Sequence, residues 1–258
     1  MSAPAPPASH GLLEGKAVVV TAAAGTGIGS ATARRCLEEG ALVLVSDHHE
    51  RRLSETAEQL EDAAGGRPPT VVCDVTQEGD VARLIDTAVA ELGRIDVMVN
   101  NAGLGGTAAL VDMTDEQWHA VLDVTLTGTF RCTRAALRHM LERRAGAIVN
   151  NASVVGWRAQ AGQAHYAAAK AGVMALTRCA AIEAAPANVR VNAVAPSLAM
   201  HPFLAKVTTE ELLEELTERE AFGRAAEPWE VANVIVFLAS DYSSYMTGEV
   251  VSVSSQHP

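Results

Sequence analysis

The sequence predicts an α/β protein in which one doubly wound parallel sheet of about seven strands carries helices on both faces. Short runs of β-branched residues alternate with longer stretches whose apolar residues recur at helical spacing. This alternation calls for a parallel sheet whose crossover connections are right-handed. Hydrophobic residues make up 48% of the chain, enough to cover both faces of such a sheet. The expected strands are residues 17–21, 42–46, 71–73, 95–99, 147–151, 189–194 and 250–253.

The helices of the first half are marked by their ends or by an apolar face. The first spans residues 27–39 and ends at Gly40, because glycine is common just after a helix. A charged helix over residues 50–64 follows the second strand. The next helix precedes strand 95–99 and has one apolar face of 3.6-residue period, formed by Val81, Leu84, Ile85, Ala88, Val89 and Leu92.

The helices of the second half begin with characteristic capping residues. Thr114 and Gln117 form a capping box for a long helix that runs towards Arg144. Another helix lies between the fifth and sixth strands. Pro228 opens the last helix at its first turn, where the missing N–H group of proline costs no hydrogen bond.

Both the start of the chain and one insertion depart from this alternation. Residues 1–12 are rich in Pro and Ala and lack the basic and apolar regions of a secretory signal, so we expect a disordered tail. Residues 13–258 are then one domain. Within it, residues 201–224 form an extra helical insertion that is acidic along TTEELLEELTERE. We expect this insertion to be a substrate lid.

Composition and charge exclude several classes of protein. A formal charge of −11 argues against a nucleic-acid partner. No apolar run approaches the ~18 residues of a membrane span, so we expect no membrane partner. The four cysteines are far apart and show no metal-binding spacing, which favours reduced thiols, no metal site and a cytoplasmic protein. They are Cys36, Cys73, Cys132 and Cys179.

A glycine-rich turn joins the first strand to the first helix. Glycines there allow a tight turn and let a pyrophosphate approach the helix N-terminus, where free N–H groups favour an anion. This position predicts a Rossmann-type dinucleotide site, although Thr32 occupies the third glycine position of G-x-G-x-x-G. The residues expected to contact the cofactor phosphates are Gly25, Thr26, Gly27, Ile28 and Gly29.

Asp47 ends the second strand, eighteen residues after Gly29. A carboxylate there can accept both ribose hydroxyls of NAD and would repel the 2′-phosphate of NADP, so we expect NAD. The alternative is a solvated turn residue, and Arg51 and Arg52 could still reach a phosphate. Asp74, at the end of the third strand, is placed to meet the adenine edge.

Three residues together predict acid–base chemistry on an alcohol or ketone. Tyr166 and Lys170 are one helical turn apart, so their side chains share a face. A phenol is too weak an acid to serve as a base at neutral pH, and a neighbouring ammonium lowers its pKa. Ser153 follows the fifth strand and can hold the reacting oxygen. A tyrosine–lysine pair alone is usually a surface pair; the serine and the glycine turn make that interpretation much weaker.

These motifs resemble the short-chain dehydrogenase/reductase family over residues 12–253. The resemblance implies that Asn101, Ala102 and Gly103 line the nicotinamide ribose, and that Lys170 also binds that ribose. It further assigns Val75, Pro196 and Ala199 to the cofactor site. The matching segments are GTGIG (25–29), CDV (73–75), NNAG (100–103), NASVVG (151–156), YAAAK (166–170), VNAVAP (191–196) and FLASDYSSYMTGE (237–249).

The sequence departs from the family pattern at four places. The glycine-rich loop is one residue longer. Thr125 stands where the family has the asparagine of a catalytic tetrad, which helps to hold a water beside the lysine. We hypothesise that the Thr125 hydroxyl keeps a water-mediated proton route from Lys170, in a slightly kinked long helix. The alternative is that Thr125 only packs. The usual PG and terminal glycine pair are replaced at 196–197 and 254–255.

We expect the substrate to be a small-molecule ketone or alcohol. Trp157, Arg158, Gln160 and Gln163 follow Ser153 and should face the pocket mouth, where the arginine could anchor a carboxylate, phosphate or thioester tail or be a packed surface residue. The segments WRAQ and HYAAAKAGVMALTRCAAIEA, with the ending VSVSSQ, resemble reductases of steroid-ring and acyl-CoA breakdown. We therefore favour a bulky hydroxy/keto acyl-CoA. The family also implies a homotetramer.

Two alternatives to this interpretation remain. A 3-oxoacyl-[acyl-carrier-protein] reductase is one, although the stretch 184–187 lacks the basic residue common in that group. A protein that only senses NAD is the other, and the retention of the serine, tyrosine and lysine counts against it.

Overall fold

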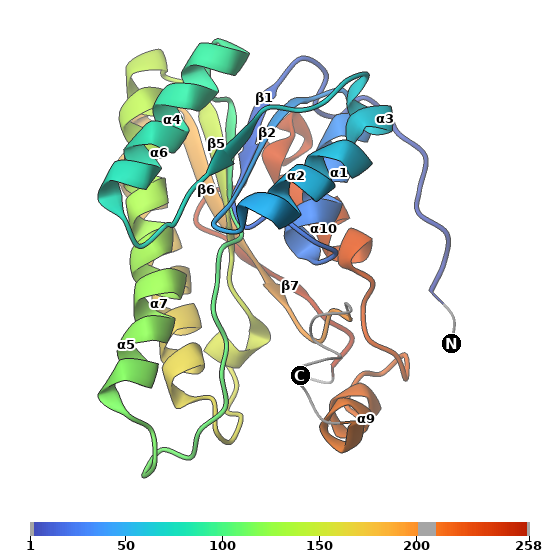
Figure 1. Ribbon diagram of the computed structural model, residues 1–258, viewed down its shortest axis with the longest axis vertical. Coiled ribbons are helices and arrows are strands. Elements are labelled where there is room, and N and C mark those ends of the chain that lie inside the picture. The colour runs from blue at the N-terminus through green and yellow to red at the C-terminus, as the bar shows by residue number, and fades with distance from the viewer. Residues whose placement is uncertain (1–2, 201–209, 257–258) are drawn as a thin grey trace.

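The computed structural model describes residues 3–200 and 210–256. Its centre is a seven-stranded parallel sheet in the order β3-β2-β1-β4-β5-β6-β7, which confirms the predicted fold (Figure 1). The chain moves outwards from β1 to one edge and then returns to β4 beside β1. Ligands of such sheets bind at the carboxyl ends of the strands where the order reverses. The strands are β1 (Ala17–Val20), β2 (Leu42–Asp47), β3 (Thr70–Val72), β4 (Val97–Asn100), β5 (Gly146–Asn151), β6 (Val189–Pro196) and β7 (Val250–Val253).

Helices cover both faces of this sheet (Figure 1). Helices α1 and α10 lie together on one face, and α4, α6 and α7 lie on the other. Helix α9 lies apart, near the C-terminus and beyond β7 (Figure 1). The described helices are α1 (Ile28–Glu38), α2 (Glu50–Gln59), α3 (Glu61–Ala64), α4 (Glu78–Leu92), α5 (Asp115–Leu122), α6 (Gly128–Arg143), α7 (Ala164–Ala184), α9 (Glu210–Glu218) and α10 (Pro228–Ala239).

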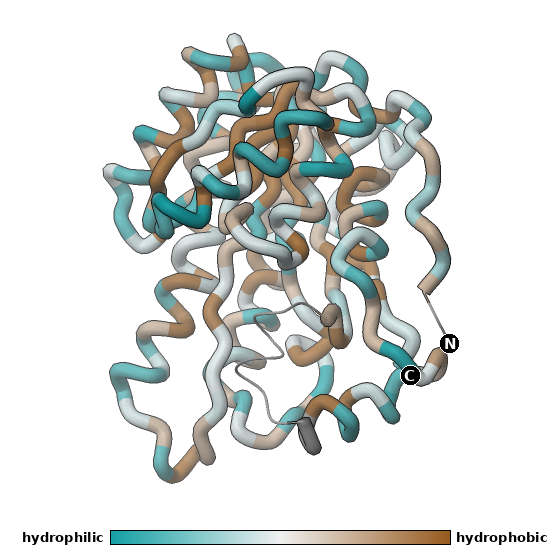
Figure 2. The backbone as a smooth tube through the Cα atoms, turned by 45° about the vertical axis from the view of Figure 1, so that its right-hand side comes forward, coloured by the Kyte–Doolittle hydropathy of each residue, from teal (hydrophilic) through white to brown (hydrophobic). Residues whose placement is uncertain are grey.

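The sheet separates two hydrophobic cores. In β1, Val18 and Val20 face α1 and α10, whereas Val19 faces α4 and α6. Successive strand residues point to opposite faces, so strands buried on both sides are apolar throughout. Figure 2 shows the hydrophobic residues concentrated in these central strands. Among the described residues, no helix is long and apolar enough to cross a membrane.

Two predicted helices are interrupted. The helix expected over 50–64 is broken at Leu60 into α2 and α3. The long helix expected from Thr114 to Arg144 begins at its capping box as predicted, but contains a π-helical turn, η1 (Asp123–Thr127), between α5 and α6. Such turns insert one residue into a helix and often mark functional sites.

The end of the predicted disordered tail is held against the domain. The buried Glu39 carboxylate accepts hydrogen bonds from the N–H groups of His10 and Leu12, both at 3.0 Å. It also pairs with Arg35 at 2.7 Å. The disorder of the residues before His10 stays a prediction. Of the predicted lid, residues 201–209 lie outside the described residues, and α9 forms part of the remainder.

Candidate active site

The three predicted catalytic residues lie at the carboxyl end of β5 and the start of α7. Ser153 is buried and caps the short helix η2 (Val154–Gly156), since its Oγ accepts the N–H of Val155 at 3.3 Å. Helix α7 carries Tyr166 and Lys170 on successive turns. The Lys170 Nζ lies 5.5 Å from the centre of the Tyr166 ring, and the Ser153 side chain is near enough to the tyrosine to lower its pKa.

Burial controls the ionisation of this group. Loss of hydration raises the pKa of Tyr166, and the nearby Ser153 side chain acts in the opposite direction. Burial lowers the pKa of Lys170 to about 8, because the apolar surroundings disfavour the ammonium. The lysine is therefore poised to exchange its proton near neutral pH, as an acid–base residue requires. In the protein alone, burial opposes the lowering of the tyrosine pKa that we expected from the neighbouring ammonium.

Thr125 lies in η1, near Lys170, and its hydroxyl is hydrogen-bonded to the backbone of Leu104. Its Oγ1 accepts the N–H of Leu104 at 3.0 Å and donates to the Leu104 carbonyl at 3.2 Å. Its own carbonyl accepts the Thr129 hydroxyl at 2.7 Å. A Cβ added to Gly103 would lie 3.4 Å from the Lys170 Nζ and 3.8 Å from the Thr125 Oγ1. Thr125 thus fastens the loop after β4 within reach of the lysine.

The glycine-rich turn is held against β2 and α2 and leaves the N-terminus of α1 uncapped. Gly27 caps α1 without any side-chain hydrogen bond. The free N–H groups of this first turn are the donors that a pyrophosphate needs. The preceding N–H groups are used within the protein: Ala23 donates to the Ser46 carbonyl, Ala24 to Asp47 and Gly25 to the Thr56 hydroxyl.

At two positions of this turn the backbone restricts which amino acid can be accommodated. A Cβ on Gly29 would stand 2.2 Å from the Ala22 carbonyl oxygen and 2.5 Å from the Asn101 Nδ2, so only glycine fits there. Ala22 adopts φ +48°, a left-handed conformation that favours glycine. The sequence alone shows no glycine at position 22, so this strained turn could not be predicted.

Asp47 is buried at the tip of β2. Its carboxylate accepts the N–H groups of Ala24 at 3.2 Å and His49 at 2.9 Å. His48 Nδ1 lies 3.4 Å from the same carboxylate. Burial raises the pKa of Asp47, opposed by these hydrogen bonds and by nearby cationic groups. Sequence reasoning missed His48, which follows Asp47 directly and approaches its carboxylate to 3.4 Å.

The remaining predicted cofactor residues occupy different roles. Asp74 accepts the N–H and hydroxyl groups of Thr76 at 2.9 and 2.8 Å, so its carboxylate stabilises its own turn. The side chain of Val75 packs against Gly128 of α6. Asn101 donates to the Ala22 carbonyl at 3.0 Å and thereby ties β4 to the glycine-rich turn. Pro196 ends β6 beside Ser153.

Comparison with known proteins agrees with this arrangement. A family model described as Enoyl-(Acyl carrier protein) reductase matches residues 22–255. The crystal structure of a short chain dehydrogenase from Mycobacterium smegmatis superposes with a TM-score of 0.89 at 62% sequence identity, over 100% of this chain and 99% of that one. The chain belongs to the short-chain dehydrogenase/reductase family.

Two curated relatives indicate the range of this similarity. The chain is 66% identical, over 99% of its length and 98% of the relative, to the (5R,7aS)-5-hydroxy-7a-methyl-1-oxo-2,3,5,6,7,7a-hexahydro-1H-indene-carboxyl-CoA reductase of Mycobacterium tuberculosis. It is 43% identical to the 3-oxoacyl-[acyl-carrier-protein] reductase FabG of Thermotoga maritima, over 93% of this chain and 97% of that protein. This short-chain dehydrogenase/reductase is therefore an oxidoreductase that acts on CH–OH or ketone groups with a nicotinamide cofactor.

The predicted substrate residues of this dehydrogenase/reductase lie around η2 and α7. Trp157 is 49% exposed. Arg158 donates to the side chain of Gln256 and so joins the η2 loop to the C-terminal segment. Gln163 is the residue before α7. Ala199, which the family resemblance assigns to the cofactor site instead, pairs with Ala226, and this pairing fixes the loop that follows β6.

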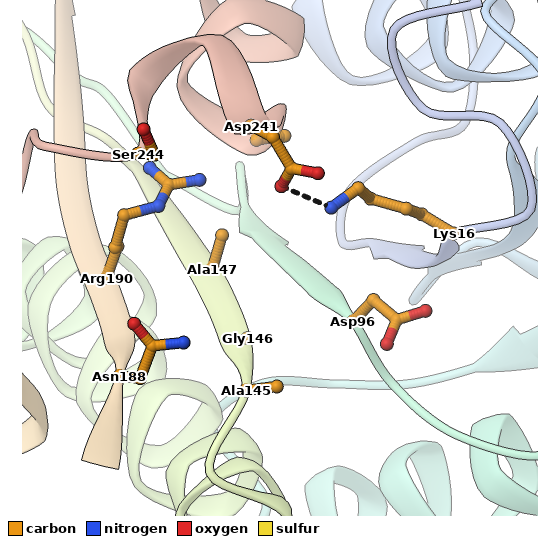
Figure 3. Close-up of a pocket in the computed structure, with 10 residues that line it drawn as sticks. Lys16, Asp96, Ala145, Gly146, Ala147, Asn188, Arg190, Asp241 and Ser244 are labelled. Carbon is orange, nitrogen blue, oxygen red and sulfur yellow. Dashed lines mark hydrogen bonds and ion pairs between the residues drawn. The ribbon is translucent and has the colours of Figure 1, made fainter.

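A separate hollow of about 180 Å³ lies at the opposite end of the sheet (Figure 3). Its charged side chains are already engaged. Lys16 pairs with Asp241 at 2.7 Å, and the Arg190 guanidinium donates to the Leu238 carbonyl at the end of α10. Since α/β sheets bind ligands at the carboxyl ends of their strands, we assign this hollow to the packing of the fold.

Proposed function

We propose that this protein interconverts a secondary alcohol and a ketone with NAD(H), on a bulky hydroxy/keto acid linked to coenzyme A. The observation that carries the proposal is the meeting of buried Ser153 and Lys170 with half-buried Tyr166, in a protein whose first helix has an uncapped N-terminus. The substrate class is supported by the Mycobacterium tuberculosis relative, whose name specifies an indene-carboxyl-CoA.

In the reducing direction each residue has a distinct task. The nicotinamide, when bound, supplies the hydride to the carbonyl carbon. The Ser153 hydroxyl holds the carbonyl oxygen, and the Tyr166 hydroxyl gives that oxygen its proton. The Lys170 ammonium stabilises the phenolate that remains and returns a proton to it. Oxidation of the alcohol reverses these steps, with the Tyr166 phenolate as base.

The preference for NAD rests on Asp47. Its buried carboxylate ends β2, next to the N–H groups that hold the glycine-rich turn. A 2′-phosphate at this position would bring a second anion against a carboxylate that two backbone N–H groups keep in place. Arg51 lies further along, is exposed and faces Glu55 at 3.7 Å, so it does not neutralise Asp47.

The proposed assembly is a homotetramer in the cytoplasm. Helices α6 and α7 present apolar side chains that the described sheet does not cover, among them Phe130, 40% exposed, and Ile182, 77% exposed. Side chains of this kind on a helical face favour an interface between subunits.

A carrier-protein-linked 3-oxoacyl substrate is the second candidate. The 43% identity to the Thermotoga maritima reductase favours it. The stretch Ala185–Ala187 after α7 contains no basic residue that would meet an acidic carrier protein. A protein that only senses NAD would not need the serine, tyrosine and lysine to meet.

The test is a turnover assay with NADH and a panel of cyclic ketones, their coenzyme A thioesters and a 3-oxoacyl carrier protein. We expect the highest kcat/KM for a cyclic keto acyl-CoA. Preference for the carrier protein would favour the second candidate, and no turnover of any member would favour the sensor.

A further inference from the structure

The Lys170 ammonium is held by a residue outside the predicted catalytic group. Lys170 is only 3% exposed, and its Nζ donates to the backbone carbonyl of Asn151 at 2.5 Å. Burial is the sole cause of its lowered pKa, so no carboxylate among the described residues stabilises its charge. The groups around it, Tyr166, Gly103 and Thr125, are uncharged at neutral pH. An ammonium has three N–H donors, so each acceptor in this corner matters.

The side chain of Asn151 is oriented by a chain of donors that begins at the glycine-rich turn. Asn101 donates its Nδ2 to the carbonyls of Ala22 at 3.0 Å and Thr21 at 3.2 Å. Its Oδ1 must therefore face Asn151, which donates its own Nδ2 to it at 2.9 Å. This arrangement leaves the Asn151 Oδ1 as a buried acceptor that takes no hydrogen bond from any described residue. A buried oxygen of this kind calls for a donor.

The hydroxyl hydrogen of Thr125 is already donated to the loop after β4. Its hydroxyl both donates to and accepts from the backbone of Leu104, and its carbonyl already accepts from Thr129. The hydroxyl oxygen keeps one lone pair that a water beside Lys170 could use, but it has no hydrogen left to donate. An acceptor free of any described partner is the Oδ1 of Asn151, the residue whose backbone carbonyl already contacts the lysine.

We propose that Asn151 is a positioning residue for Lys170: its carbonyl takes one N–H of the ammonium directly, and its side-chain oxygen takes a second through one bridging water. Because Asn101 braces the same side chain, this contact ties the lysine to the cofactor turn at Ala22. Asn151 thereby stabilises the charged form of Lys170, the form that returns a proton to Tyr166. The inference rests on the proposed function, in which that proton is needed.

The experiment measures the protonation of the lysine directly and needs no substrate. The chain has three lysines, Lys16, Lys170 and Lys206, so lysine labelled with ¹³C at Cε gives a simple NMR spectrum. Lys170→Met assigns the signal. Asn151→Ala removes the side-chain oxygen and keeps the backbone carbonyl. Asn150→Ala is the matched control, because this neighbour is equally part of β5 but bonds to Asn100 and Thr177 on the other face.

We expect Asn151→Ala to lower the pKa of Lys170 by about one unit, a tenfold change in the ratio of its two forms. Asn150→Ala should reduce thermal stability and leave this titration in place. An unchanged titration in Asn151→Ala, or an equal shift in Asn150→Ala, would overturn the proposal. Should Asn151→Ala fail to fold, Asn151→Ser keeps a polar side chain too short to reach Asn101 and is expected to shift the titration in the same direction.

The proposed function is tested separately. Wild-type turnover that depends on Tyr166 would stand even if Asn151 had no effect on the lysine. Conversely, a shift of the Lys170 titration in a protein without turnover would support the positioning role and remove the proposed reaction.

Discussion

Replacing Gly29 by alanine tests how closely the cofactor turn is packed. The new Cβ would stand 2.2 Å from the Ala22 carbonyl oxygen, whereas ordinary contact begins at 3.4 Å. The turn must therefore retreat by about 1.2 Å, away from β4 and from the Asn101 side chain that holds it. Overpacking of this kind costs about 1–3 kcal/mol. Urea denaturation should show that loss in the free energy of unfolding, and NADH fluorescence titration should show weakened binding.

Gly27→Ala is the matched control for this prediction. Gly27 has extended backbone angles that any residue adopts, and a Cβ there meets no described atom within 4 Å. Its stability should stay within about 0.5 kcal/mol of wild type. NADH binding should still weaken, because a methyl group at the N-terminus of α1 hinders an approaching phosphate. If Gly29→Ala were as stable as Gly27→Ala, the claim that Gly29 lies in close contact with Ala22 and Asn101 would be contradicted.

Three further predictions concern the cofactor, the lysine and the long helix. Asp47→Ala should narrow the ratio of kcat/KM for NADH over NADPH, and a wild-type preference for NADPH would contradict the role of Asp47. Burial lowers the pKa of Lys170 from 10.5 to about 8, so between these pH values the unfolded chain binds more protons than the folded one. The loss of folding stability caused by the buried ammonium therefore becomes smaller as the pH rises through this range. Lys170→Met should thus be the more stable protein below pH 8, with the difference shrinking towards pH 10.5; a difference independent of pH would refute this. Thr125→Val leaves the Leu104 N–H and carbonyl unpaired, so the free energy of unfolding measured in urea should fall by about 1–3 kcal/mol and turnover should fall as well. Stability equal to that of wild type would show that these two hydrogen bonds contribute nothing.

Local patterns were sufficient to predict most of the fold. The capping box of Thr114 and Gln117 forms as expected, with bonds of 3.0 and 3.2 Å. The strands lie close to their predicted positions, since runs of β-branched residues bounded by turns leave few alternatives. The four-residue spacing of Tyr166 and Lys170 also places these two residues beside each other on one helix face, whatever surrounds the helix.

Contacts between distant segments could not be predicted. The Thr56 hydroxyl holds the glycine-rich turn from α2, and the Asn151 side chain reaches Asn101 from the neighbouring strand. Arg158 is bound to Gln256, near the far end of the chain. None of these pairs has a periodic signal, because each depends on how the sheet brings separate strands together. The π-helical turn at Thr125 likewise reflects tertiary packing rather than local propensity.

The central claim is that Tyr166 exchanges the proton with the reacting oxygen. The most direct test compares wild type and Tyr166→Phe in NADH-dependent reduction of the best ketone from the panel, with NADH affinity measured in parallel. Removal of the hydroxyl should lower kcat by ~10²–10⁴-fold, the usual contribution of general acid–base catalysis, while the variant folds and binds NADH as wild type does. Turnover by Tyr166→Phe within a few-fold of wild type would contradict the account.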